Sequence, residues 1–394
     1  EYRKIDGHWY QIEHGREFQV DEEVITVKFR GVVNEEQIVA FNNSQDVQAL
    51  RTNILGFTDL RIPGNADPLK LIEAYQNSGL VEIAEANTFG EYLGVPNDPK
   101  FSDQWHHKHS QDHDIDTPKA WNLETGTPSV IIGVLDSGTD ILHEDLEGNI
   151  WVNPGEDIDN DGVVWDTGDI NGVDDDGNGK VDDLVGWDFY HGNNNVVGPI
   201  YHGTWVAGIA AAVTNNDTGV AGVAGGWGSS SPGAKMLICA VGDYTPSSSV
   251  VDDAILYAVS KNAKIINMSF TVGESAAINA AIGSAYLTYG AFIVAASGND
   301  GVATVGYPAR AQYVVGVGAT NTSDQRASFS NYGSALDVVA PGVDIWSTKK
   351  NNTYGSASGT SAAAPQVSGI GALLKSYNSS FTNAQIEERI AEGA

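Results

Sequence analysis

Cysteine and basic residues are both scarce in this chain of 394 residues. Its single cysteine, Cys239, excludes an intrachain disulfide and any CxxC metal or redox site. The 21 Lys and Arg stand against 51 Asp and Glu, a formal charge of −30, so polyanions and anionic membrane surfaces should repel the protein. The sequence also lacks an apolar run long enough to span a bilayer. We therefore expect neither a nucleic-acid partner nor a membrane partner.

The apolar content is nonetheless that of a folded protein. Hydrophobic residues make up 41% of the chain, with 9 Trp, 15 Tyr and 11 Phe, which is enough to build a sizeable core. The sequence begins at Glu1 with a charged stretch that has no apolar signal core, and it ends inside a helical pattern. We expect that both ends have been trimmed.

Short apolar runs alternate with helical patterns over much of the chain. Runs closed by glycine or turn residues, typical of buried parallel strands, occupy 129–138, 234–242, 263–270, 291–298, 313–320 and 336–342. Helical patterns occupy 247–262 and 274–290. The alternation predicts an α/β domain over 96–394, with a doubly wound, mostly parallel sheet, helices on both faces and a site at the carboxyl ends of the strands.

The first 95 residues follow a different pattern. Residues 24–29 and 81–89 indicate strands, and 67–80 indicate an amphipathic helix. They predict a small α+β, ferredoxin-like domain over 1–95, and 96–105 has the composition of a linker.

Three polar residues stand beside glycine at the predicted ends of strands or helices. Asp136 closes the first strand of the predicted sheet, His202 opens a helix of small residues, and Ser361 begins another helix with Pro365 in its first turn. A hydroxyl needs a base to become a nucleophile, and the base needs an orienting anion, so Ser, His and Asp supply one catalytic set. Taken singly, each residue is more often a cap or a turn former.

The motifs DSG at Asp136, HGT at His202 and GTSAAAP at Ser361 resemble, in this order, the signatures of the subtilisin-like serine peptidases. A fourth motif, AASGND at 295–300, lies between the last two. The resemblance covers about residues 99–385 and implies a serine endopeptidase of subtilisin-like fold. It makes Asp136, His202 and Ser361 the triad and Asn299 a donor to the oxyanion.

The resemblance also implies how a substrate is bound. Residues 269–271 correspond to a strand that pairs with an extended peptide, and Gly306 to the base of the primary specificity pocket, with Tyr307–Pro308 in the cis form. The substrate-binding residues would be Ser269, Phe270, Thr271, Ala296, Gly298 and Gly306. Glycine at the base of the pocket leaves room for a large apolar residue before the scissile bond, although Gly306 could instead serve only as a turn.

Some positions depart from the family pattern. Trp205 stands where a second, structural histidine is usual, so it should alter packing but not proton transfer. Ala362 stands where Met is common, and Gln366 where His is common. All of them leave the triad untouched.

An acidic insertion at 153–188 carries two patterns that suit calcium. The first pattern has carboxylates at alternate positions before a glycine: Asp157, Asp159 and Asp161. The second has oxygen-bearing side chains in the same spacing before a glycine, followed by one more carboxylate: Asp174, Asp176, Asn178 and Asp182. Neither has Glu at the twelfth position of an EF-hand, because residue 168 is Gly and residue 185 is Val. Other ligands would come from carbonyls, water or neighbours such as Asp166 and Asp183. The alternative is a solvated acidic loop without an ion.

A further structural calcium site is implied only by the family resemblance. Its ligands would be Asp145, Asn216, Thr218 and Val220, with Gln104 as a possible addition. The segment HHKHSQDH holds His106, His107, His109 and His113; it could bind zinc or nickel, but we expect a solvated surface segment because adjacent residues rarely converge on one metal.

By the same resemblance, residues 1–95 correspond to a propeptide that inhibits the enzyme in cis and assists its folding, with a processing site near 87–95. The alternative is an unrelated accessory domain. The sequence thus predicts a secreted, monomeric, calcium-stabilised serine endopeptidase acting on proteins or peptides. Two alternative hypotheses remain: the protein is a dedicated processing peptidase, or it is a non-catalytic module whose acidic loops make calcium-dependent contacts.

Overall fold

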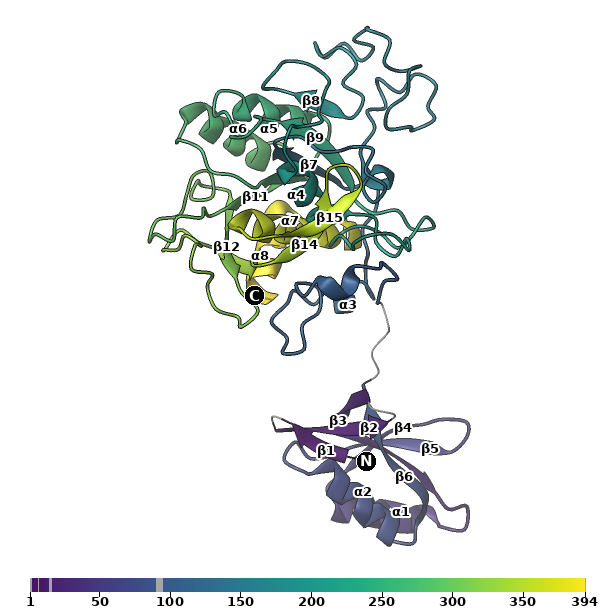
Figure 1. Ribbon diagram of the computed structural model, residues 1–394. Coiled ribbons are helices and arrows are strands. Elements are labelled where there is room, and N and C mark those ends of the chain that lie inside the picture. The colour runs from purple at the N-terminus through teal and green to yellow at the C-terminus, as the bar shows by residue number, and fades with distance from the viewer. Residues whose placement is uncertain (1, 6, 14–15, 90–94, 394) are drawn as a thin grey trace. The chain divides into compact units, whose positions relative to one another are not determined.

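The computed structural model describes residues 2–5, 7–13, 16–89 and 95–393. The chain consists of two compact units, residues 1–93 and 94–394 (Figure 1). Within the described residues, no helix is both long and apolar enough to cross a membrane.

The N-terminal unit is an antiparallel sheet with two helices. Its elements are β1 (Tyr2–Ile5), β2 (His8–Glu13), β3 (Arg16–Phe29), α1 (Glu35–Ser44), β4 (Gln48–Thr52), β5 (Phe57–Arg61), α2 (Pro68–Asn77) and β6 (Val81–Thr88). Strand β3 pairs with both β5 and β6, so the sheet between β4 and β6 has the order β4-β5-β3-β6. From β3 to β6 the chain therefore runs strand, helix, strand, strand, helix, strand. The strands predicted at 24–29 and 81–89 and the helix at 67–80 are confirmed.

A small apolar core explains why these elements form. Alternate residues of β3, Ile25 and Val27, are fully buried against Leu60 and Tyr75. Asp67 caps helix α2 by accepting hydrogen bonds from the backbone N–H groups of Leu69 and Lys70, and Pro68 occupies the first helical position.

The C-terminal unit is built on a seven-stranded parallel sheet. Its strands are β7 (Ile131–Asp136), β8 (Gly186–Asp188), β9 (Lys235–Ala240), β10 (Ile265–Met268), β11 (Phe292–Ala296), β12 (Val315–Thr320) and β13 (Val338–Pro341). The order across the sheet is β13-β12-β11-β10-β7-β9-β8, and every pairing is parallel. All the predicted apolar runs lie in this sheet. The reversal of strand order beside β7 places the end of that strand at a switch point, where sites of open α/β sheets form.

Helices cover both faces of this sheet. The remaining elements of the C-terminal unit are α3 (Thr117–Ala120), α4 (His202–Ala211), α5 (Val251–Ser260), α6 (Ala276–Leu287), β14 (Ile345–Lys349), β15 (Thr353–Ala357), α7 (Thr360–Tyr377), α8 (Asn383–Gly393) and the short turns η1 (Phe101–Asp103) and η2 (Glu147–Asn149). Helices α5 and α6 pack with Ile131 and Leu135 of β7, whereas α4 and α7 pack with Ile132 and Val134. The two faces of β7 thus enter two separate cores, which confirms the doubly wound arrangement.

The acidic insertion contributes no helix or strand between residues 151 and 185. Aspartate side chains fix the conformation of this insertion, because they accept hydrogen bonds from many of its backbone N–H groups. It forms the long loops beside β8 in Figure 1.

Candidate functional site

The ends of β7 and α4 bring an aspartate and a histidine together. Asp136 is the last residue of β7 and is 5% exposed; His202 is the first residue of α4. The His202 Nδ1 and Asp136 Oδ1 atoms lie 2.7 Å apart, and Asp136 Oδ1 also accepts a hydrogen bond from Ser137 N at 2.7 Å. Burial favours the neutral imidazole, but the charge and hydrogen bond of Asp136 outweigh it and raise the pKa of His202 above the usual 6.5.

The glycine that follows His202 allows this approach. A Cβ at Gly203 would lie 2.1 Å from the carbonyl oxygen of Gly138 and 3.2 Å from the Asp136 Cβ. Any side chain there would push α4 away from the end of β7. Trp205, one turn further on, is fully buried, and its indole N–H donates to the Ile345 carbonyl at 3.0 Å. Its role in packing is what the sequence predicted.

Ser361 is the second residue of α7, a helix that packs against α4. It is 7% exposed, and the helix places free backbone N–H groups and a positive dipole end around it. Pro365 lies beyond the first turn of α7, so the prediction that it falls in the first turn was wrong; the helix begins at Thr360 and accommodates the proline in its second turn. Gln366 donates from its side chain to the carbonyls of Pro341 and Ala362.

Thr360 fixes the position of Asn299 beside Ser361 through the Asn299 side chain. Its Oδ1 accepts hydrogen bonds from the backbone N–H of Thr360 at 2.8 Å and from the Thr360 hydroxyl at 3.0 Å. The amide Nδ2 is therefore free to face the other way. A Cβ placed on Gly359 would lie 2.9 Å from Ser361 Oγ and 3.5 Å from Asn299 Nδ2, so hydroxyl and amide flank one point. The contact between Thr360 and Asn299 was not predicted from the sequence, although Thr360 belongs to the Gly-Thr-Ser motif.

The predicted substrate segment follows β10 directly. Ser269 is 3% exposed, and its hydroxyl accepts a hydrogen bond from Asn267 Nδ2 at 3.0 Å, whereas Thr271 is exposed. Gly306 is closely approached by Thr271, because a Cβ there would lie 2.6 Å from the Thr271 Cγ2. The Tyr307–Pro308 bond is cis, as expected. Ala296 ends β11, and the N–H of Gly298 donates to the Thr360 hydroxyl.

A cavity of about 150 Å³ opens between the Asp136–His202 pair and the substrate segment. Its lining comprises Asp136, Ser137, Ile200, His202, Gly242, Asp243, Tyr244, Thr245, Pro246, Ser269 and Phe270. The residues from 242 to 246 follow β9 and were not singled out in the sequence.

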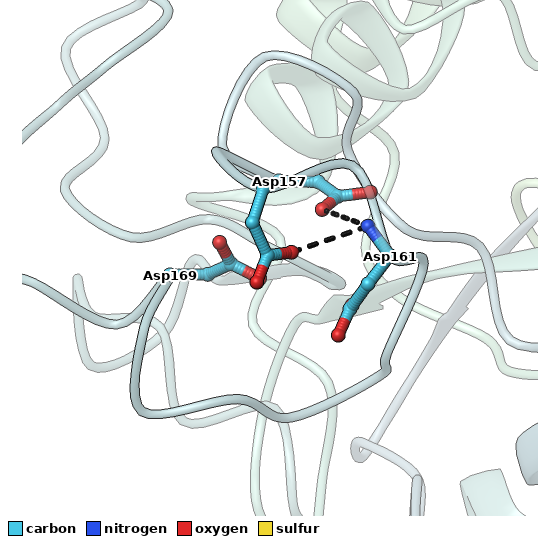
Figure 2. A group of neighbouring side chains, drawn as sticks. Asp157, Asp161 and Asp169 are labelled. Carbon is cyan, nitrogen blue, oxygen red and sulfur yellow. Dashed lines mark hydrogen bonds between the residues drawn. The ribbon is translucent and has the colours of Figure 1, made fainter.

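The first acidic loop, residues 157–169, brings four carboxylates together. Ligand atoms of Asp157, Asp159, Asp161 and Asp169 all lie within 4.8 Å of one another. Figure 2 shows Asp157, Asp161 and Asp169 around the inside of this loop. Asp169 is 1% exposed; its Oδ1 accepts from Ile158 N at 2.8 Å, and its Oδ2 has no hydrogen-bond partner. Asp169 was missed because it stands one place beyond the twelfth position of the pattern.

The second acidic loop is organised differently. Asp174 and Asp176 accept hydrogen bonds from the loop backbone, but Asp182 turns to the N–H groups of Asn171 and Gly172. The carboxylates that gather here are Glu156, Asp176 and Asp183, and the Lys261 ammonium pairs with the last two. Asn178 donates to Asp183 at 3.0 Å. Lys261, which directly follows the last residue of α5, thus supplies positive charge where an ion was predicted.

Asp145 forms the centre of a third group. It is fully buried, accepts hydrogen bonds from Asn216 Nδ2 at 2.9 Å and Val220 N at 2.8 Å, and burial raises its pKa to about 8. Gln104 does not join it, because both ends of its amide bond the backbone of Ala221. Asp98 approaches the same loop instead. Its Oδ2 accepts from Asn215 N at 2.7 Å, its Oδ1 is buried without a partner, and burial raises its pKa to about 6.

The histidine-rich segment is not a solvated surface segment, so that prediction was wrong for its first half. His106 and His107 are fully buried, and their rings lie 4.2 Å apart between centroids. His107 is hydrogen-bonded to Thr117 Oγ1 at 2.7 Å and to the Ala221 carbonyl at 3.0 Å. Burial lowers the pKa of both imidazoles, so both are neutral and behave as core residues. The prediction relied on the polar composition of the segment, but the neutral His107 ring packs against Phe101 and Trp121, and the His106 ring packs against His107.

Comparison with known proteins places this arrangement among hydrolases. A family model described as "Subtilase family" matches residues 127–394. The "Thermophilic serine proteinase" of Bacillus sp. (strain AK1) is 34% identical over 389 residues, 97% of this chain and 84% of that protein. The "Halolysin-like extracellular serine protease Nep" of Natrialba magadii is 32% identical over 381 residues, 95% of this chain and 63% of that protein. A solved protease from Pseudoalteromonas arctica PAMC 21717 superimposes with a TM-score of 0.58 at 33% identity, covering 75% of this chain and 91% of that one.

Proposed function

The chain belongs to the subtilase family and is a serine endopeptidase, and on this basis we propose that Asp136, His202 and Ser361 are its catalytic triad. The observation that supports the assignment best is the 2.7 Å hydrogen bond between His202 Nδ1 and Asp136 Oδ1. Because Asp136 occupies Nδ1, the Nε2 nitrogen of His202 is left to take the proton of Ser361.

The proposed triad would carry out the reaction in two stages. His202 removes the proton from Ser361 as its oxygen attacks the carbonyl carbon of a peptide, and Asp136 stabilises the imidazolium that forms. His202 then gives this proton to the leaving amine, which departs and leaves an acyl-enzyme. A water molecule, deprotonated by His202, then attacks the acyl carbon; the bond to the Ser361 oxygen breaks, His202 returns the proton to that oxygen, and the carboxylic acid product leaves.

The oxyanion of each tetrahedral intermediate is stabilised by Asn299 Nδ2 and the Ser361 N–H. Thr360 acts as a positioning residue, since it holds the other end of the Asn299 amide. Donors fixed before the reaction stabilise charge without reorganising during it, and the N-terminus of α7 adds a favourable dipole.

The pH dependence of hydrolysis tests the role of His202. Only the neutral imidazole accepts a proton, and Asp136 raises the pKa of His202 above 6.5. We therefore expect kcat/KM to rise with pH through a limb that lies above 6.5, measured over about pH 5 to 9 with a neutral peptide substrate. In Asp136→Asn the residual activity should have its limb at lower pH. An Asp136→Asn limb unmoved from that of the unaltered protein would contradict this assignment.

The substrates are proteins or peptides, bound in extended form along Ser269, Phe270 and Thr271. Backbone pairing of this kind is largely blind to sequence, so broad specificity follows. Ala296, Gly298 and Gly306 border the pocket for a large apolar residue before the scissile bond. A cleavage profile concentrated on a single sequence would favour the dedicated processing peptidase instead.

The N-terminal unit is a ferredoxin-like propeptide that acts in cis on a monomeric, secreted enzyme. The strand, helix, strand, strand, helix, strand order of β3 to β6 supports this proposal. A relative named as extracellular also matches 95% of the chain, a share that extends into this unit. The predicted processing site at 87–95 falls mostly on residues 90–94, which lie outside the described residues.

Calcium stabilises the enzyme at two of the three predicted groups. The first acidic loop fits a hard cation: Asp157, Asp159, Asp161 and Asp169 supply oxygen ligands, and a buried oxygen of Asp169 lacks any other partner. Asp98 also has a buried oxygen without a partner, and Asp145, whose two oxygens accept hydrogen bonds from Asn216 and Val220, would add a second carboxylate there, with Thr218 in the same loop. The ion there would be structural and supply charge compensation only. Asp174, Asp176, Asn178 and Asp182 fit less well, because Lys261 already neutralises Asp176.

Removing calcium should lower the thermal stability. A site filled at 100 times its dissociation constant contributes about 2.7 kcal/mol, and in a domain of this size each kcal/mol is worth about 2–4 °C in Tm. We expect Asp169→Asn to bind one ion fewer by calorimetric titration and to lower Tm in calcium by several degrees but not in EDTA. Asp175→Asn, in the same insertion, is the control that should behave as the parent. Equal stoichiometry in Asp169→Asn and the parent would refute the loop site.

A further inference from the structure

The cavity between the Asp136–His202 pair and the substrate segment carries a charge that the reaction does not use. Asp243 lines it together with Tyr244, Thr245 and Pro246, in the turn that follows β9. The Asp243 side chain is 36% exposed, so its carboxylate remains in contact with solvent. The other charged groups of the lining, Asp136 and His202, are already paired with each other.

The position of the cavity tells which part of a substrate would enter it. In an extended peptide, successive side chains point in opposite directions. If the residue bearing the scissile carbonyl points toward Gly306, the residue before it points to the opposite side. The lining of the cavity includes His202 as well as Ser269 and Phe270 of the substrate segment, so this preceding side chain would enter between the substrate segment and the imidazole.

We propose that this cavity selects a basic side chain at the residue preceding the one that carries the scissile carbonyl, with Asp243 as the specificity-determining residue. The inference rests on the proposed peptidase function. A volume of about 150 Å³ suits one extended side chain, and the tyrosine and proline of the lining would contact its methylene groups. The Asp243 carboxylate would then pair with the ammonium or guanidinium at its end.

A histidine beside the cavity makes this preference depend on pH. The His191 Nε2 lies 3.6 Å from Asp243 Oδ2, and its Nδ1 lies 2.8 Å from Asp188 Oδ2. The ring of Tyr190 is its other neighbour. A protonated His191 shares the charge of Asp243 with the substrate, whereas a neutral one leaves that charge to the substrate alone. Selection of a basic residue therefore strengthens as pH rises through the titration of His191.

The test compares peptides that differ only at this residue, carrying lysine, norleucine or glutamate before a common phenylalanine. The ratio of their kcat/KM values cancels the titration of His202, which affects all of them alike. We expect lysine to be preferred to norleucine by about three- to fivefold, the scale of a partly exposed ion pair, and to lose this advantage at high salt. Glutamate should be the poorest.

Asp243→Asn should bring the lysine to norleucine ratio to about one, and His191→Gln should remove its dependence on pH. The control is Asp253→Asn, which deletes an exposed carboxylate on α5 outside the cavity lining and should keep the parent ratio. A parent ratio of one, or a preference that survives Asp243→Asn, would overturn the proposal. If no peptide of the set is cleaved at all, the proposed triad fails rather than the selectivity.

Discussion

Replacing Ser361 with alanine is expected to abolish peptide hydrolysis and to leave the chain in one piece. The substitution would remove the proposed nucleophile and should retain the fold, because Ser361 is the second residue of α7 and alanine is a good helix former. The corresponding loss in subtilisin is about 10⁶ in kcat, and that scale is taken over from subtilisin rather than derived from this structure. The measurement combines a fluorogenic peptide assay with the intact mass after incubation with calcium.

The same experiment tests the proposed propeptide. The parent protein should acquire a new N-terminus downstream of Phe89, and Ser361→Ala should not, unless a trace of active parent is added. Ser368→Ala offers a matched control, since it removes a buried hydroxyl from the same helix, where it donates to Asn267 Oδ1 at 2.9 Å. Processing of Ser361→Ala at the normal rate without added enzyme would show that the cut is not made by this site.

Replacing Asn299 with alanine should lower kcat and leave KM nearly unchanged. In its proposed role, Asn299 Nδ2 would act on charge that develops only in the transition state, so its loss should affect the chemical step and not ground-state binding. Loss of such a donor costs about 10²–10³ in kcat, a range that comes from subtilisin. Steady-state kinetics on one peptide at the pH of maximum activity gives both parameters.

Thr360 separates positioning from direct participation. Thr360→Val removes the hydroxyl that bonds Asn299 Oδ1 but keeps the backbone N–H bond, so we expect a smaller fall in kcat than for Asn299→Ala. Thr360→Ser keeps the hydroxyl and should recover most of that loss. A rise in KM without a fall in kcat for Asn299→Ala would mean that the amide binds the ground state instead.

Local patterns were enough to predict six of the seven strands of the parallel sheet and helices α4 to α7 around it; the three-residue strand β8, at the end of the acidic insertion, was not predicted. The apolar runs that end at Asp136 and near Asn299 are buried on both faces, and burial on both faces is what a continuous apolar run encodes. The pairing of His202 with Asp136 was anticipated through ordered motifs, since nothing in the spacing of residues 136 and 202 fixes their distance in space.

Other features depended on contacts that a linear pattern does not carry. Lys261, just after the end of α5, pairs with Asp176 of an acidic loop far away in the sequence, so a calcium prediction made from the loop alone could not include it. His106 and His107 were assigned to the surface because their neighbours in the sequence are polar, yet both are fully buried: His107 packs against Phe101 and Trp121, and His106 packs against His107. Asp169 was not predicted because the EF-hand pattern places its last ligand at residue 168, one residue earlier.

Reaction with a fluorophosphonate tests the whole account most directly. A phosphonate reacts with a serine that is activated by a neighbouring base and held beside oxyanion donors, and it leaves unactivated serines alone. We expect one label for each molecule of processed protein, located on Ser361 by peptide mapping and absent from both Ser361→Ala and His202→Ala. An unlabelled Ser361 in protein that still hydrolyses peptides, or a label on another residue, would contradict it.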